Sequence, residues 1–223
     1  VNPLEIPQML TDLGQHDQRL RGVYLFQGLG LTSNVYFLGT KRLTLVDAGV
    51  GNQPNSLIPR IEALKMNAGE VAQVILTHAH HDHVGGLFEI LEVATPKVYL
   101  HRLDARYIAS YLGPNLVEVD DGTSIETELF SLQVIHTPGH TSGGICLYVK
   151  EKRILLSGDT VFPSGLYGAY HGESGSLKEM VHSLRRLTEL NVDILLAGHG
   201  EPLITDGSNQ IMLSYNNALR RYR

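Results

Sequence analysis

Apolar residues in this chain come in short runs separated by Gly-rich or polar turns, which is the pattern of β-strands. The runs are too short for helices of ordinary length, and many are rich in the β-branched and aromatic side chains that favour strands. They predict strands at Val23–Gln27, Asn34–Leu38, Leu43–Asp47, Val74–Thr77, Val98–Leu100, Leu132–Thr137, Gly144–Val149, Arg153–Ser157 and Asp193–Ala197.

Other segments repeat apolar residues at three- and four-residue spacing, which predicts helices with one buried face. The clearest stripe consists of Leu177, Met180, Val181, Leu184 and Leu187. Helices are therefore expected at Gln53–Met66, Val84–Val93, Arg102–Leu112, Ser176–Leu190 and Ser208–Arg223.

The order of these elements is neither a strict β-α alternation nor an all-β run. Two mixed sheets packed face to face, with helices outside, would place every apolar face against another. We therefore predict an α+β fold, a four-layer αββα sandwich. No repeat, low-complexity tract or long linker divides the chain, so a single domain over residues 1–223 is expected.

Composition and charge narrow the range of partners. The 223 residues include 18 Lys and Arg against 23 Asp and Glu, a net charge of −5. Nucleic-acid binders usually need a basic surface, so RNA and DNA are not expected partners. No apolar run is long enough for a membrane span, and the start, VNPLEIPQML, lacks the basic flank and apolar core of a signal peptide. We expect a cytoplasmic protein; a homodimer is compatible with the sequence.

Eleven histidines in such a chain raise the question of a metal site. His78, His80, Asp82 and His83 lie together in HAHHDH, directly after the predicted strand VILT. His78 and His80, two apart in an extended segment, project to one side. If the chain then turns into a helix, Asp82 and His83 point to a neighbouring position. The segment can thus give two ligands to each of two adjacent metal ions, and the rest of about four ligands per zinc must come from other loops.

Three further predicted strands end in a Gly beside a metal-capable side chain. LQVIHT leads to TPGHT with His140, RILLSG leads to Asp159, and DILLAG leads to His199. Loops at strand ends, held by a rigid sheet, are where binding sites are commonly built. These three residues are therefore the candidates for the missing ligands.

The motif HAHHDH, followed in order by TPGHT, SGDT and AGHG, resembles the metallo-β-lactamase superfamily over nearly the whole chain. The resemblance implies an αββα sandwich with a binuclear metal site in the groove between the sheets. The resemblance implies that the first ion is held by His78, His80 and His140, and the second by Asp82, His83 and His199. It implies that Asp159 bridges the two ions. Asp47, in LVDAG, would support these ligands from behind.

The resemblance also bears on the reaction. With an aspartate at position 159, the ligand pattern is closer to that of the glyoxalase II-like hydrolases and the lactonases than to that of lactamases with a cysteine ligand. The one cysteine, Cys146, is expected in a core. Two divalent ions roughly 3.5–4 Å apart would turn a shared water into a bridging hydroxide, which attacks a small-molecule thioester, ester or lactone. Asp82 would orient this nucleophile and accept its proton. Zinc suits the ligands best, and iron and manganese accept the same mixture.

The substrate stays open at this point. The loop after Asp159 is Gly-rich and aromatic, and Tyr167, Tyr170 and His171 either contact substrate or only pack there. Glyoxalase II proteins carry basic residues for glutathione in this loop, whereas no Lys or Arg lies between residues 154 and 177. A lactonase acting on acyl-homoserine lactones is the alternative; a phosphodiesterase or RNA-processing nuclease and an iron-dependent persulfide dioxygenase fit less well.

Five other histidines are not expected to bind metal. His81 should point away from the ions although it lies inside the motif, and His136 should be buried or support a ligand. The remaining ones, His16, His101 and His182, are expected at the surface.

Overall fold

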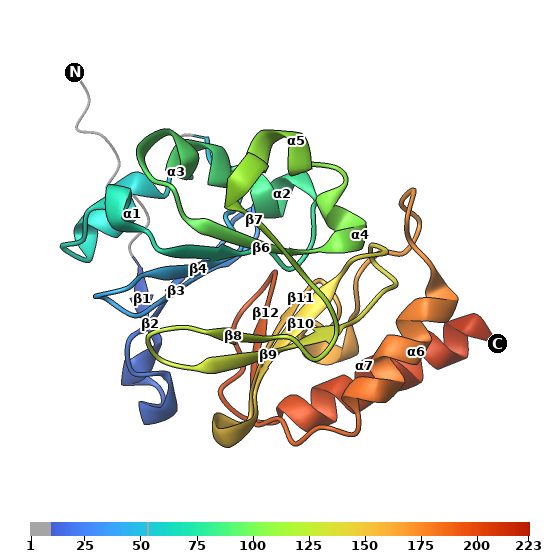
Figure 1. The fold of residues 1–223 in the computed structure, drawn as a ribbon. Coiled ribbons are helices and arrows are strands. Elements are labelled where there is room, and N and C mark those ends of the chain that lie inside the picture. The colour runs from blue at the N-terminus through green and yellow to red at the C-terminus, as the bar shows by residue number, and fades with distance from the viewer. Residues whose placement is uncertain (1–9, 53) are drawn as a thin grey trace.

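The computed structural model describes residues 10–52 and 54–223, and two mixed β-sheets lie at its centre (Figure 1). The strands of the first sheet lie in chain order, antiparallel from β1 to β4 and parallel from β4 to β7. Their bounds are β1 (Thr11–Asp12), β2 (Val23–Phe26), β3 (Val35–Leu38), β4 (Thr44–Val46), β5 (Gln73–Ile75), β6 (Lys97–His101) and β7 (Leu116–Val119).

The second sheet has the order β12-β11-β10-β9-β8. Neighbours from β8 to β11 are antiparallel, while β12 runs parallel to β11. The bounds are β8 (Ser124–Glu126), β9 (Ser131–His136), β10 (Ile145–Val149), β11 (Ile154–Gly158) and β12 (Ile194–Ala197).

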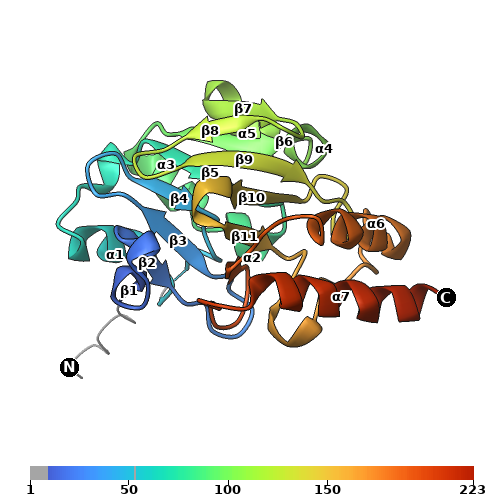
Figure 2. The ribbon, with the colours of Figure 1, turned by 90° about the horizontal axis from the view of Figure 1, so that it is seen from below.

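Helices cover the outer face of each sheet (Figures 1 and 2). Those of the first half lie over the first sheet, whereas the last two pack against each other over the second sheet. Their bounds are α1 (Ile58–Ala63), α2 (His81–Val84), α3 (Leu87–Val93), α4 (Arg102–Ala105), α5 (Ala109–Leu112), α6 (Leu177–Leu187) and α7 (Gly207–Tyr222).

Successive side chains along a strand point into different hydrophobic cores, one on each face of the sheet. In β3, Val35 and Phe37 join the core beneath α1 and α3, while Tyr36 and Leu38 face the core between the sheets. In β11, Leu156 faces the same central core and Leu155 faces α6 and α7. Because successive strand residues point to opposite faces, each sheet is covered on both sides. The predicted four-layer αββα sandwich is confirmed.

The elements differ from the predicted ones mainly where they are short. The strands β1, β7 and β8 were not expected, because two to four residues leave too little pattern to recognise. The helix predicted at Arg102–Leu112 is divided into α4 and α5, since the N–H groups of Tyr107 and Ile108 bond three residues back and tighten the turn. Gly85 and Gly86 separate α2 from α3 within the second predicted helix.

Two expectations concern residues that the structure does not describe. The start of the helix expected from Gln53 lies outside the described residues, and α1 begins at Ile58. The segment interpreted as lacking a signal peptide falls largely on residues 1–9, which are also outside them. Among the described helices, none combines the length and apolar character needed to cross a membrane.

His101 corrects one prediction, because it is buried, with 4% of its surface exposed, rather than at the surface. Its ring stacks on that of His136, with centroids 4.0 Å apart. Its Nδ1 accepts a hydrogen bond from the Leu103 N–H (3.3 Å) and so caps the first turn of α4. His16 and His182 are exposed, as expected.

Burial, and next the neighbouring His136, lower the pKa of His101 from 6.5 to about 4. The unfolded chain therefore binds this proton more tightly than the folded one. The contribution to stability is complete above pH 6.5 and is lost as the pH falls towards 4. At pH 5 the loss amounts to about 2 kcal/mol of unfolding free energy. His101→Asn, which keeps a capping acceptor, should show a smaller loss of stability than the parent between pH 7 and pH 5 in urea denaturation. Equal losses in the two proteins would contradict this assignment.

Candidate metal centre

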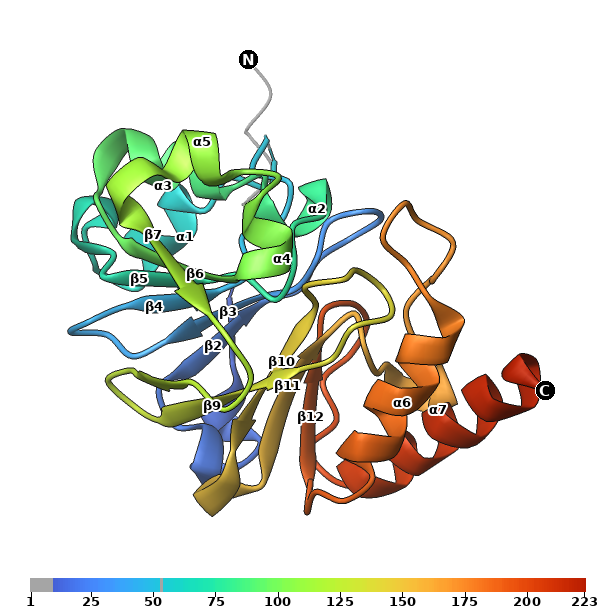
Figure 3. The ribbon, with the colours of Figure 1, turned by 45° about the vertical axis from the view of Figure 1, so that its right-hand side comes forward.

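Loops that follow five strands meet where the two sheets come together at one edge of the sandwich (Figure 3). Asp47 follows β4, HAHHDH follows β5 and enters α2, His140 follows β9, Asp159 follows β11 and His199 follows β12. Backbone hydrogen bonds join these loops across the sheets, from Ile145 N–H to the Thr77 carbonyl (2.9 Å) and from Asn34 N–H to the Gly198 carbonyl (2.7 Å). The fold thus brings together residues that are far apart in sequence.

Three imidazoles form the first group of the site: His78, His80 and His140. The Nδ1 atom of His80 lies 3.1 Å from His78 Nε2 and 2.8 Å from His140 Nε2. A neutral imidazole has one N–H and one lone pair, so three nitrogens that face one another cannot all be satisfied by each other. One nitrogen from each ring lies within 4.8 Å of the other two, an arrangement that suits a metal ion.

The second group consists of Asp82, His83 and His199. The Oδ2 atom of Asp82 lies 3.2 Å from His199 Nε2 and 3.6 Å from His83 Nε2. Asp82 and His83 are successive residues of α2, so the turn from extended segment to helix directs them away from the first group. This is the division of HAHHDH that the spacing predicts.

Asp159 lies between the two groups. Its Oδ1 is 3.3 Å from His83 Nε2, while its Oδ2 is 3.4 Å from His140 Nε2 and 3.6 Å from His199 Nε2. Asp159 Oδ1 and His83 Nε2 are buried, yet neither makes a hydrogen bond within the described chain. Leaving such atoms unpaired costs about 1–3 kcal/mol each. The donor set and these two unused atoms therefore fit metal ions.

Asp47 supports the cluster through hydrogen bonds with Thr77 and His83. Its backbone has φ of 60°, a left-handed conformation that Asp tolerates better than most residues. Its carboxylate accepts hydrogen bonds from Thr77 N–H (2.7 Å) and pairs with His83 Nδ1 at 2.8 Å. Because Asp47 accepts a hydrogen bond from His83 Nδ1, the other ring nitrogen, Nε2, is directed towards Asp159.

The loop after Asp159 acts on the site through its backbone. The carbonyl oxygen of Ala169 accepts a hydrogen bond from His140 Nδ1 (2.6 Å), which leaves Nε2 free to face the other imidazoles. Gly168 permits this approach, since a Cβ there would stand 2.0 Å from the Asp159 carbonyl oxygen and 3.0 Å from His140 Nδ1.

Protonation states at neutral pH favour metal binding at His78, His80 and Asp159 but oppose it at His83. Burial is the main cause that lowers the pKa values of His78 and His80, so these rings stay neutral. The pKa of Asp159 is strongly lowered, since the pull of His83 and neighbouring histidines outweighs the effect of burial. Burial also opposes a charge on His83, but the carboxylates of Asp47 and Asp159 outweigh it and raise that pKa. A proton on His83 is therefore the main competitor of a metal ion.

The three side chains expected to line the substrate site show packing contacts. Tyr167 and Tyr170 stack with centroids 6.4 Å apart, and Tyr167 packs against the core under α6 and α7. Tyr170 also contacts the ring of His171 at 4.0 Å, and its hydroxyl accepts a hydrogen bond from Arg221 (3.4 Å). Their contact with substrate stays a prediction.

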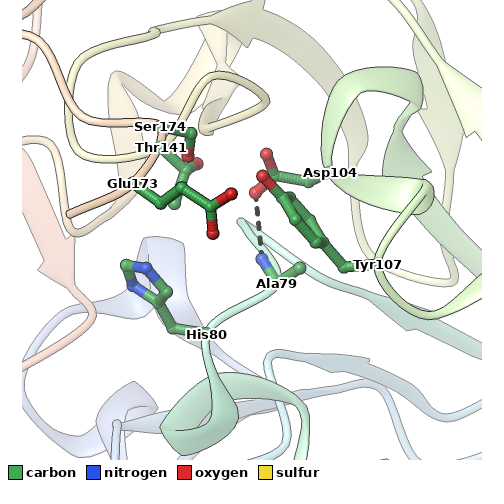
Figure 4. Close-up of a pocket in the computed structure, with 7 residues that line it drawn as sticks. All are labelled: Ala79, His80, Asp104, Tyr107, Thr141, Glu173 and Ser174. Atoms are coloured by element: carbon green, nitrogen blue, oxygen red, sulfur yellow. Dashed lines mark hydrogen bonds between the residues drawn. The ribbon is translucent and has the colours of Figure 1, made fainter.

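Sequence reasoning missed a cavity of about 200 Å³ beside His80. It is lined by Ala79, His80, Asp104, Tyr107, Thr141, Glu173 and Ser174 (Figure 4). Glu173 lies in the loop after Asp159, and its charge is the one signal in the sequence that points to this cavity. Asp104 gave no signal, because one acidic residue in an amphipathic segment is ordinary.

Two residues near the motifs stay apart from the cluster. His81 is exposed on α2. Cys146 is fully buried beneath α6, and burial raises the pKa of its thiol to about 11, so it is not a reactive thiolate at neutral pH.

Comparison with known proteins identifies the family of the chain. Residues 28–199 match the model of the metallo-β-lactamase superfamily. The chain is 31% identical over 134 residues to a hydroxyacylglutathione hydrolase of Francisella tularensis subsp. novicida, which covers 60% of this chain and 50% of that protein. It spans between 50% and 68% of the length of three curated relatives.

Solved structures agree in fold. The metallo-β-lactamase family protein TTHA1429 from Thermus thermophilus aligns with a TM-score of 0.73 at 24% identity, over 90% of this chain and 80% of that one. TTHA1623, described in a di-iron-bound form, aligns with a TM-score of 0.66 at 27% identity, over 87% and 97%. The matched family segment contains Asp47 and all seven of the clustered side chains. The chain belongs to the metallo-β-lactamase superfamily.

Proposed function

We propose that this protein is a binuclear metal-dependent hydrolase that cleaves a thioester, ester or lactone bond in a small molecule. The observation that carries the proposal is the overlap of the ligand groups: a middle group of His78, His83 and Asp159 shares His78 with the first group and His83 with the second. The first group would hold one divalent ion, Asp82, His83 and His199 would hold a second, and Asp159 would lie between them. When bound, the ions would lower the pKa of a water molecule and polarise the scissile carbonyl.

The three carboxylates of the centre differ in access to solvent, which suggests their roles. The side chain of Asp82 is 28% exposed, against 10% for Asp159 and 3% for Asp47. Burial raises the pKa of Asp82, but its hydrogen bond with His199 outweighs this and lowers the pKa, so the group is ionised at neutral pH. Asp82 is therefore the carboxylate best placed to orient a water molecule and accept its proton.

The same chemistry bears on metal and substrate. Zinc is the preferred metal for imidazole and carboxylate ligands, and the di-iron-bound form of TTHA1623 keeps iron as an alternative. The similarity to a hydroxyacylglutathione hydrolase supports a thioester, but no Lys or Arg lines the cavity beside His80 to bind glutathione carboxylates. Esters and lactones, acyl-homoserine lactones among them, therefore stay in the proposal. Cytoplasmic location, a single domain and a homodimer remain predictions.

A substrate screen of zinc-, manganese- and iron-loaded protein tests this proposal. It should include a glutathione thioester, acyl-homoserine lactones, simple aryl esters, a β-lactam and a phosphodiester, with metal counted per chain and oxygen consumption followed. We expect about two ions per chain and hydrolysis of at least one carbonyl substrate. Hydrolysis of the phosphodiester alone would favour a nuclease, and oxygen uptake with a single iron would favour a dioxygenase; either result rejects the proposal.

Asp159→Ala should bind less than the full metal complement and lose nearly all hydrolytic activity, because the shared carboxylate is removed. Asp159→Asn, which keeps the size of the side chain, should show the same direction of change. His81→Ala is the matched control, since His81 lies within HAHHDH but is exposed, and its metal content should equal that of the parent. Full metal content and activity in Asp159→Ala would reject the ligand assignment.

Asp47→Asn should weaken metal binding by about 10- to 100-fold, because an amide cannot fix the Nδ1–H tautomer of His83 as a carboxylate does. Titration with zinc against a competing chelator measures this affinity. Asp206→Asn is the control: Asp206 also has a left-handed backbone, with φ of 71°, and lies outside the site. Equal weakening in both variants would show a general effect of the substitution and no specific role of Asp47.

A further inference from the structure

The cavity beside His80 adjoins the proposed metal centre, because His80 belongs to both. Figure 4 shows the carboxylate of Glu173 directed into the space between His80 on one side and Tyr107 and Asp104 on the other. A molecule bound at the metals could therefore extend one end into this cavity. About 200 Å³ is enough for a short chain with a polar terminus.

The two acidic residues of the cavity have no cationic partner among the described residues. Asp104 is fully buried, and its oxygens accept hydrogen bonds from the N–H groups of Ala79 (3.0 Å) and Gly143 (2.7 Å). Glu173 makes no ion pair or side-chain hydrogen bond in the described chain, and no Lys or Arg belongs to the cavity wall. The negative charge of the cavity is thus not neutralised from within.

The carboxylates of the metal centre do not account for this charge. Asp82 and Asp159 lie among the proposed metal ligands, and Asp47 pairs with His83, so these three would offset the charge of the ions themselves. Asp104 and Glu173 lie outside all three ligand groups. They remain as surplus negative charge at the substrate end of the site.

The backbone on both sides of Glu173 is anchored. The N–H of Gly175 closes a turn onto the Gly172 carbonyl (3.0 Å), and the Ser174 hydroxyl accepts a hydrogen bond from Ser142 N–H (3.3 Å). The N–H of Ser176 bonds the carbonyl of Gly139 (2.8 Å), one residue before His140. Hydrogen bonds to the loop that carries His140 therefore hold the backbone on both sides of Glu173 beside the metal centre.

The cavity wall also offers polar and aromatic groups that suit an ammonium ion. Thr141 is buried, and its hydroxyl has no hydrogen-bond partner in the described chain. The ring of Tyr107 already attracts one cation, since the guanidinium of Arg106 lies 4.8 Å from its centroid and donates to its hydroxyl at 2.8 Å. Arg106 is not part of the wall, but it is the group that could compete with a ligand for these partners.

We infer that this cavity is a subsite for a positively charged group of the substrate, such as a primary ammonium, with Glu173 as the residue that selects it. The inference rests on the proposed function, because it places the charged group at the far end of an acyl compound whose carbonyl lies at the metals. Substrates with a carboxylate at that end would be disfavoured.

Calorimetric titration of the zinc-loaded protein with carboxylic acids, the products of such a hydrolysis, tests the subsite without requiring turnover. The ligands are ω-amino acids of four, six and eight carbons, each compared with the unsubstituted acid and the dicarboxylic acid of equal length. For at least one length the parent protein should bind the amino acid about three- to fivefold more tightly than the unsubstituted acid, and the dicarboxylic acid least tightly. Several chain lengths are used so that the test does not depend on an assumed distance between the cavity and the metals.

Variants assign the preference to Glu173. Glu173→Gln should remove the preference for the amino acid, and Glu173→Lys should reverse it in favour of the dicarboxylic acid. Arg106→Gln should strengthen it, since a competing cation is removed. Glu179→Gln is the matched control, because Glu179 is exposed on α6 and lies outside the cavity wall, and it should bind as the parent does.

Absence of any preference in the parent, or an unchanged preference in Glu173→Gln, would overturn the subsite. The proposed function is tested separately by the substrate screen. If the binding preference follows Glu173 but no carbonyl substrate is hydrolysed, the subsite stands and the reaction is wrong. If hydrolysis occurs without the preference, the reaction stands and the subsite is wrong.

Discussion

The site depends on burying several polar groups that cannot satisfy one another. Three imidazoles face each other at hydrogen-bond distance, and His83 Nε2 and Asp159 Oδ1 make no hydrogen bond in the described chain. Unpaired buried groups each cost about 1–3 kcal/mol, so the cluster persists only where the surrounding structure over-determines it. Here the central core between the two sheets lies beneath it, and strand ends from both sheets fix the loops. The stability of the sandwich thereby offsets the cost of burying these polar groups and keeps them in place to bind cations.

The sequence allowed the architecture and the main side chains of the site to be predicted, for physical reasons that can be named. Strands such as β3 and β11 are buried on both faces, so their continuous apolar runs stand out. The residues gathered at the metal centre follow such strands directly, and their order along the chain carried the resemblance. Short edge strands such as β7 and β8 carry no comparable pattern, and their positions are set by pairing with neighbours.

Other features could not be predicted because they depend on contacts between distant segments. The fold brings the ring of His101 at the end of β6 against that of His136 at the end of β9, and this contact covers His101. The loop after Asp159 was expected to act through its aromatic rings. Its observed contact with the metal centre is instead the carbonyl of Ala169, and a carbonyl group has no signature in sequence. Only the glycine at 168, where a Cβ would collide with Asp159, hints at this close approach.

Asp104 connects the two loops that carry the first ligand group. Its carboxylate holds the N–H of Ala79, which lies between His78 and His80, and the N–H of Gly143, which follows the loop of His140. A Cβ at Gly143 would lie 2.5 Å from the same carboxylate, so the approach requires glycine. The group that adds negative charge to the cavity is therefore also a group that positions the loops of the first ligand group. Any change at Asp104 would alter both the loops that carry the first ligand group and the charge of the cavity, whereas a change at the exposed Glu173 alters the charge alone. A substitution at Glu173 can thus change which charge the cavity selects without disturbing the histidines. A substitution at Asp104 cannot, because this residue both positions the ligand loops and adds charge to the cavity.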